Sequence, residues 1–120
     1  MLELSAFETI EKIRSRELTA KEVLEAHLAQ IKKVDGVPGK LDFGELSETE
    51  STKVHAFITL TEDLAYQQAE EVDRQLDNGI DPGILAGVPI TVKDIFCVNF
   101  RFYSVFDGNC FNWCSIIISP

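Results

Sequence analysis

The sequence predicts an α/β domain over residues 1–98, followed by a segment of different character at residues 99–120. Two capping boxes and a third run of helically spaced apolar residues predict helices, and two short runs of β-forming residues predict strands. Hydrophobic residues make up 45% of the chain and charged residues 26%, as in a folded domain rather than a disordered one. With 120 residues, the chain is long enough for one small domain.

The first two helices are marked by their amino-terminal caps. Residues 5–8 and 19–22 both fit a capping box, in which a Ser or Thr hydroxyl and a Glu side chain three residues later satisfy each other's backbone N–H groups. The second helix should end at Asp35, because Gly36 and Pro38 follow. Apolar residues after each cap keep helical spacing and are expected to face the core: Phe7, Ile10 and Ile13, then Leu24, Leu28 and Ile31.

The middle of the chain predicts a loop, a strand and a third helix. Residues 36–53 are rich in Gly, Ser, Thr and Glu, which indicates a long loop, with one helical turn starting at residues 47–50. Residues 56–60 read Ala-Phe-Ile-Thr-Leu and predict a short strand. The third helix should span residues 62–77, because residues 78–79 (Asn-Gly) close it. Its inner stripe is expected to be Ala65, Ala69, Val72 and Leu76.

The last predicted strand spans residues 88–93. Successive side chains of a strand point to opposite faces, so Val88, Ile90 and Val92 share one face. We expect that face to be anchored in the core. The end of such a strand would hold the Lys93 amine rigidly.

Residues 99–120 differ in composition from everything before them. They hold six of the chain's eleven aromatic residues but only two charges, Arg101 and Asp107. Neither helical nor alternating spacing is present, and three consecutive isoleucines stand at residues 116–118. We interpret this segment as an aberrant tail foreign to the domain, produced by a shifted reading frame or a read-through intron; native core sequence is the alternative. We therefore expect the tail to lack regular packing.

Composition excludes several classes of function. The formal net charge of −9 should repel phosphate backbones, which argues against direct nucleic-acid binding. No secretory signal and no apolar window of about 18 residues is evident, so we expect a soluble, cytoplasmic protein with unpaired thiols. Cys110 and Cys114 have no second ligand pair, and we therefore expect no metal site.

Residues 87–94, Gly-Val-Pro-Ile-Thr-Val-Lys-Asp, carry the clearest chemical signal. They resemble the Gly-(Val/Ile)-Pro-x-x-(Val/Ile)-Lys-Asp element of the amidase-signature family. The sequence upstream of residue 87 agrees with that family in the order and spacing of its residues, so that the resemblance covers residues 3–98. Within the family, residues 55–59 and 92–95 are most similar to the A subunits of tRNA-dependent amidotransferases.

The resemblance implies an amidase-signature fold, in which helices surround a mixed sheet; this chain would hold the opening helices and first strands. It also implies a Ser–cis-Ser–Lys triad with Lys93 as its base and with Gly87 and Pro89 in support. An uncharged amine can draw a proton from a bridging serine, which in turn activates the nucleophilic serine. Asp94 would either orient the local structure or cap the following turn.

The serines of the family triad follow the lysine in Gly- and Ser-rich segments. No serine of the tail lies in such a segment, so we assign no residue of this chain as the nucleophile or as the bridging serine. We interpret the chain as an amino-terminal fragment that ends soon after its catalytic lysine, and expect it to be inactive alone. The tail serines are Ser104, Ser115 and Ser119.

For an intact parent, the resemblance implies a carbon–nitrogen ligase that uses glutamine as amido donor. It implies B and C partner subunits, with ATP and magnesium bound by the partner rather than by this chain. Two other functions remain open. One is an amidase acting on small amides, and the other is an acidic helical module that binds a partner without catalysis. Residues 87–94 favour an enzyme, because a binding module does not need a lysine at the end of a buried strand.

Overall fold

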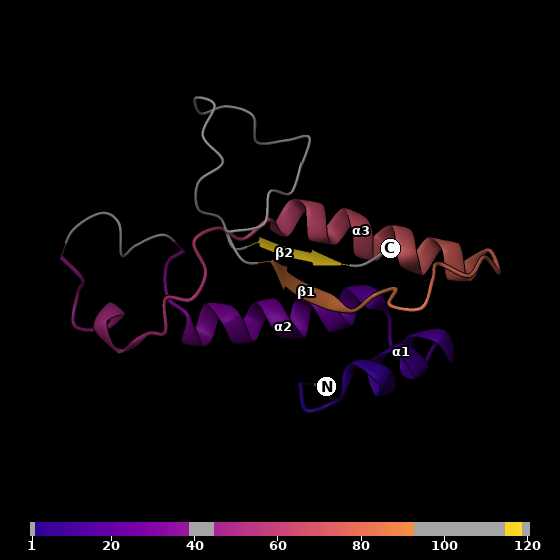
Figure 1. The fold of residues 1–120 in the computed structure, drawn as a ribbon, viewed down its shortest axis with the longest axis horizontal. Coiled ribbons are helices and arrows are strands. Elements are labelled where there is room, and N and C mark those ends of the chain that lie inside the picture. Colours follow the sequence, from indigo (N-terminus) through magenta and orange to yellow (C-terminus); the bar gives the residue numbers. More distant parts are fainter. Residues whose placement is uncertain (1, 39–44, 93–114, 119–120) are drawn as a thin grey trace, which may run out of the picture.

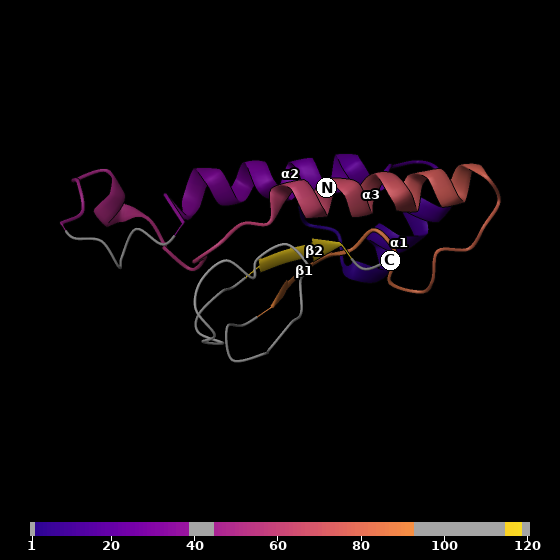
Figure 2. The same cartoon turned by 90° about the horizontal axis from the view of Figure 1, so that it is seen from above.

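The computed structural model describes residues 2–38, 45–92 and 115–118 (Figure 1). Helices α2 and α3 lie side by side, and a small ribbon of two strands covers one side of this pair (Figures 1 and 2). Helix α1 lies beside the beginning of α2. The elements in chain order are α1 (Ala6–Arg14), α2 (Ala20–Val34), the 3₁₀ turn η2 (Glu50–Thr52), α3 (Glu62–Asp77), β1 (Pro89–Val92) and β2 (Ser115–Ile118).

Capping boxes set the beginnings of α1 and α2, as predicted. At α1, the Glu8 N–H donates to Ser5 Oγ (3.3 Å) and the Ser5 N–H donates to the Glu8 carboxylate (2.8 Å). At α2, the same two bonds join Thr19 and Glu22, at 3.1 and 2.8 Å. The predicted limits of the third helix are confirmed as well, since α3 spans Glu62–Asp77.

The core lies between α2 and α3. Ala65 and Ala69 of α3 are fully buried, and such small side chains allow the two helices to approach closely. All three α-helices are amphipathic, and none of those described is long and apolar enough to cross a membrane. The buried apolar cluster consists of Ile13, Ala20, Val23, Leu24, Leu28, Ala65, Ala69, Val72 and Ala86.

Phe7 is an exception to the predicted inner stripes. Its side chain is 68% exposed, so the expectation that it faces the core is wrong. The buried residues of α1 are Thr9 and Ile13. Thr9 and Ile13 are four residues apart and share one face of the helix, whereas Phe7, two residues before Thr9, points to the other side.

Residues 56–60 form no strand among the described elements, contrary to the prediction. Their backbone donors are instead engaged by Asp35, the C-cap of α2, whose carboxylate accepts the N–H groups of Ala56 (2.5 Å) and Phe57 (3.1 Å). Asp35 is only 2% exposed, so these two bonds satisfy a buried carboxylate, while the donors at Ala56 and Phe57 lie nearer the surface. The predicted end of the second helix and the predicted helical turn, seen as η2, are both confirmed.

Strands β1 and β2 pair antiparallel, with Pro89 opposite Ile118 and Val92 opposite Ser115. The strand predicted at residues 88–93 is confirmed over Pro89–Val92 as β1; Val88 precedes it, and Lys93 lies outside the described residues. Within the described residues the sheet is this two-stranded ribbon, and the mixed sheet implied by the resemblance is not seen there.

The tail contains one regular element, which corrects part of the prediction for it. Residues 115–118 pair with β1 although no alternating pattern marks them. Consecutive isoleucines suit a strand because β-branched side chains favour extended backbone. Residues 99–114 and 119–120 lie outside the described residues, so the boundary at residue 98 stays a prediction.

Candidate active-site strand

Lys93 and Asp94, the charged pair of the predicted catalytic element, lie outside the described residues. The structure describes the backbone that leads to them. That approach comprises Gly87, Val88 and strand β1, whose last residue, Val92, directly precedes Lys93. The candidate site is therefore built from the contacts that position this strand.

Gly87 is the tightest point of the approach. It is buried and has a φ of +83°, a backbone conformation that residues with a Cβ rarely adopt. A Cβ at this position would lie 2.7 Å from Cδ1 of Ile13 and 3.1 Å from Cβ of Ala20. The backbone thus passes directly against the last turn of α1 and the first residue of α2, where only glycine fits without movement.

A turn carries the chain from Gly87 into β1. The Val88 N–H donates to the Leu85 carbonyl at 3.1 Å, and Ala86 inside this turn is buried. Pro89 is the first residue of β1, a strand position at which the missing N–H of proline is tolerated. The start of the strand is therefore fixed by both packing and a backbone bond, while the catalytic support predicted for Gly87 and Pro89 stays a prediction.

The strand is less buried than its alternation predicts. Val88 and Val92 are half-buried, but Ile90 is 40% exposed. The expected burial of all three side chains is therefore wrong for Ile90. The physical reason is that the described part of the sheet has two strands only, and no described element covers the Ile90 side chain.

Asp73 of α3 fixes the first turn of α2, the surface that Gly87 contacts. Its carboxylate accepts the Ala20 N–H at 2.8 Å and the Lys21 N–H at 3.2 Å. Arg16 lies 3.8 Å from the same carboxylate and has a φ of +63°. The first N–H groups of a helix lack intrahelical partners, and here a second helix supplies them. Sequence reasoning missed this contact, because the partners are 53 residues apart and no local pattern links them.

The charged groups with shifted pKa values lie at helix ends and in surface pairs. Hydrogen bonds from the capping residue hold the pKa of Glu8 and that of Glu22 below their usual range. The Arg74 guanidinium lowers the pKa of Glu71 to about 2, and a hydrogen bond to a glutamate of α3 raises the pKa of Lys21. In the described residues these shifts therefore concern stability rather than the strand that leads to Lys93.

The described residues contain no cluster of three or more His, Cys, Asp or Glu side chains that could hold a metal ion. Both histidine rings lie against backbone carbonyls. Nδ1 of His27 is 2.7 Å from the Val23 oxygen, and Nε2 of His55 is 2.7 Å from the Glu50 oxygen. Each ring therefore contacts the backbone of its own helix or loop, four or five residues away in sequence.

One tail serine reaches the ribbon. Ser115 begins β2, and the register sets it opposite Val92, the residue before Lys93. Ser104 and Ser119 lie outside the described residues. No Gly-Ser-Ser sequence surrounds Ser115, so the pairing gives no ground for assigning it as a nucleophile.

Known proteins match the same part of the chain. Residues 45–100 match the Amidase family profile. The chain is 42% identical over 96 residues, 80% of its length, to the A subunit of glutamyl-tRNA(Gln) amidotransferase from Streptomyces coelicolor. The corresponding protein of Corynebacterium diphtheriae is 42% identical over 94 residues, 78% of this chain, and that of Carboxydothermus hydrogenoformans is 37% identical over 91 residues, 76% of this chain. The chain spans 16% of the length of each of these curated relatives. No solved structure matches it.

Proposed function

We infer the function from the amidase-signature family of this chain, whose residues 45–100 match the Amidase family profile. We propose that the enzyme built with this segment is the A subunit of a tRNA-dependent amidotransferase. It would hydrolyse glutamine and supply the ammonia that converts Glu-tRNA(Gln) to Gln-tRNA(Gln). The identity of 42% over 96 residues to the Streptomyces coelicolor protein carries this proposal.

In this proposal Lys93 is the base of a Ser–cis-Ser–Lys triad. The uncharged amine takes a proton from the bridging serine as that serine takes the proton of the nucleophilic serine, whose oxygen attacks the amide carbon. The C–N bond then breaks as the lysine returns this proton through the bridging serine to the nitrogen, so that ammonia leaves, and water hydrolyses the acyl-enzyme to release glutamate. A proton relay of this kind requires the base to be held within hydrogen-bond reach of its partner.

The described residues would serve this chemistry by holding the strand that ends at the base. Gly87 rests against Ile13 and Ala20, and Asp73 in turn fixes the turn that contains Ala20. Asp94, directly after the base, is proposed to orient the local structure. These contacts support a rigid origin for β1, two residues before Pro89 and six before Lys93.

The proposed complex includes B and C partner subunits and works in the cytoplasm. ATP and magnesium belong to the partner in this proposal, as does the binding of charged tRNA. The net charge of −9 supports leaving tRNA to another chain, because phosphate backbones are bound chiefly by lysine and arginine.

We further propose that the 120-residue polypeptide alone does not hydrolyse glutamine, because none of its tail serines stands in a Gly- and Ser-rich setting. A small-amide amidase would use the same triad and differ only in substrate. An acidic helical binding module would need no triad at all. Activity on glutamine, on small amides, or on neither therefore separates the three functions.

A segment exchange tests the proposal. In the Streptomyces coelicolor relative, the matching segment is replaced by residues 3–98 of this chain, so that the relative supplies everything downstream. We expect the assembled enzyme to retain glutaminase activity and Gln-tRNA(Gln) formation, and the 120-residue chain assayed in parallel to show neither. Hydrolysis of small amides without glutaminase activity would favour the small-amide amidase. A folded, assembled chimera that hydrolyses no amide would contradict an enzymatic role for the segment.

A further inference from the structure

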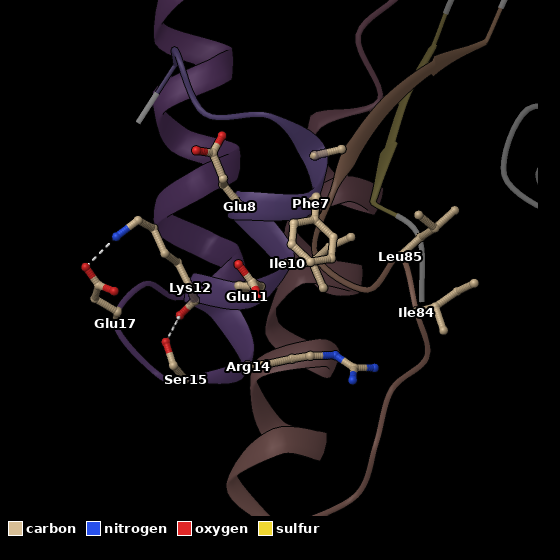
Figure 3. A pocket seen from close by; sticks show the side chains of 11 residues that line it. Phe7, Glu8, Ile10, Glu11, Lys12, Arg14, Ser15, Glu17, Ile84 and Leu85 are labelled. Atoms are coloured by element: carbon tan, nitrogen blue, oxygen red, sulfur yellow. Dashed lines mark hydrogen bonds and ion pairs between the residues drawn. The ribbon is translucent and has the colours of Figure 1, made fainter.

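An open apolar groove lies between α1 and the loop that precedes β1. Phe7 and Ile10 of α1 flank it on one side, and Ile84 and Leu85 of the loop flank it on the other (Figure 3). Its volume is about 1060 Å³. Phe7 is 68% exposed, Ile84 80% and Leu85 49%, so these side chains face solvent although the core is close by. Single exposed apolar residues are ordinary, whereas a contiguous group of them marks an interaction surface.

The groove is preformed rather than a gap between mobile segments. Arg14, at the end of α1, donates to the Asp81 carboxylate at 2.8 Å and to the Gly83 carbonyl at 3.0 Å. These bonds tie the loop to the helix at one end of the groove. The loop is held again at its other end, where Gly87 packs against Ile13. Binding to a preformed apolar surface does not have to order it first, which favours affinity.

The charge beside the groove is negative. Glu11 lies one helical turn beyond Phe7, and its carboxylate has no hydrogen-bond or ion-pair partner among the described residues. Both cations of α1 that line the groove are already engaged, Lys12 by Glu17 at 2.5 Å and Arg14 by an aspartate. With a formal charge of −9 on the whole chain, a ligand of this groove should carry positive charge next to its apolar surface.

We propose that this groove binds a basic amphipathic helix of another protein chain. An apolar stripe of that helix would lie against Phe7, Ile84 and Leu85, and a lysine or arginine beside the stripe would pair with Glu11. A second copy of this chain is a poor fit, because it brings another nine negative charges. An anionic membrane surface is disfavoured by the same repulsion. The proposal concerns a binding surface and does not depend on the proposed catalytic function.

The probe is a labelled 18-residue synthetic helix with leucines along one stripe and lysines elsewhere, and its partner probe has glutamate in place of every lysine. Fluorescence anisotropy measures both against the 120-residue chain. We expect the lysine peptide to bind at least about tenfold more tightly than the glutamate peptide. The double variant Phe7→Ser/Ile84→Ser should lose at least about tenfold in affinity for the lysine peptide. The matched control is Val54→Ser, since Val54 is 67% exposed in the loop after η2, and this variant should bind within about twofold of the parent.

Glu11→Lys provides an independent arm that leaves the apolar stripe intact. This variant should bind the lysine peptide less tightly than the parent chain does, and the glutamate peptide more tightly. Equal affinity of the double variant and the Val54→Ser control, or equal affinity for the two peptides, would overturn the proposal. Self-association or binding to phosphatidylserine vesicles that the double variant abolishes would overturn it too, by assigning the groove to a second copy or to a membrane. Circular dichroism of each variant confirms that the helices are retained.

Discussion

Replacing Gly87 with alanine tests the packing that directs β1 toward Lys93. The added methyl group would meet Cδ1 of Ile13 at 2.7 Å and Cβ of Ala20 at 3.1 Å, while the backbone keeps a φ of +83°. The left-handed backbone costs roughly 1–2 kcal/mol for a residue with a Cβ, and overpacking a buried site costs roughly 1–3 kcal/mol. We therefore expect Gly87→Ala to lower the free energy of unfolding by about 2–5 kcal/mol.

The assay is urea denaturation followed by circular dichroism at the helix band, with Gly79→Ala as the matched control. Gly79 has a φ of +70° but no atom within 4 Å of a Cβ position, so its replacement costs only the backbone term of about 1–2 kcal/mol. Ile13→Val removes the atom nearest to the new methyl group. The double variant Gly87→Ala/Ile13→Val should thus lose less than the sum of the single variants. Equal losses for Gly87→Ala and Gly79→Ala, or strict additivity in the cycle, would refute the close contact.

Three further predictions use the same denaturation assay. Asp73→Ala should cost about 1–3 kcal/mol, because it leaves two N–H groups of α2 without an acceptor, and Asp73→Asn should cost less. Asp35→Ala should cost about 2–4 kcal/mol, because it removes the buried carboxylate that accepts the N–H groups of Ala56 and Phe57, and unchanged stability would contradict its role. For Glu8, Glu22 and Glu71 the folded pKa lies below the unfolded value of 4.5, so their stabilisation is present above about pH 4.5 and is lost as the pH falls through each folded pKa, which is about 2 for Glu71. Glu22→Gln should reduce the loss of unfolding free energy between pH 4.5 and lower pH. An unchanged pH dependence in this variant would contradict the contribution of Glu22.

The helices could be predicted closely because their signals are local. A capping box is four residues long, and both boxes of this chain form the bonds that their sequences imply. The third helix ends where Asn78 and Gly79 interrupt its pattern, for the same reason. Local chemistry decides where a helix begins and ends, so a single sequence suffices to find these limits.

The features that the sequence did not predict depend mainly on contacts between distant parts of the chain. Residues 56–60 have strand propensity, but the Asp35 carboxylate takes the backbone bonds of Ala56 and Phe57. Asp73 of α3 accepts a backbone N–H at the beginning of α2, and no sequence pattern in either helix predicts this hydrogen bond. The spacing of Phe7 with Ile10 and Ile13 predicts that it faces the core, but the buried face of α1 contains Thr9 and Ile13 and leaves Phe7 exposed.

The candidate site divides in the same way. Residues 87–94 identify the family from sequence, because the order of Gly, Pro, Lys and Asp is specific. That Gly87 is wedged against Ile13 and Ala20 required the structure, since the three residues come from separate segments. Lys93 and Asp94 themselves lie outside the described residues, and their roles stay predictions.

The turnover number of the Lys93→Ala variant, measured in the segment-exchange enzyme with glutamine as substrate, tests the central claim most directly. Removing the proposed base should lower kcat by about 10³-fold or more while the complex still assembles. Lys33→Ala is the matched control, because Lys33 is an exposed lysine of α2 and its loss should leave kcat within about twofold. A folded, assembled Lys93→Ala enzyme with near-normal glutaminase turnover would contradict the assignment of Lys93 as the catalytic base.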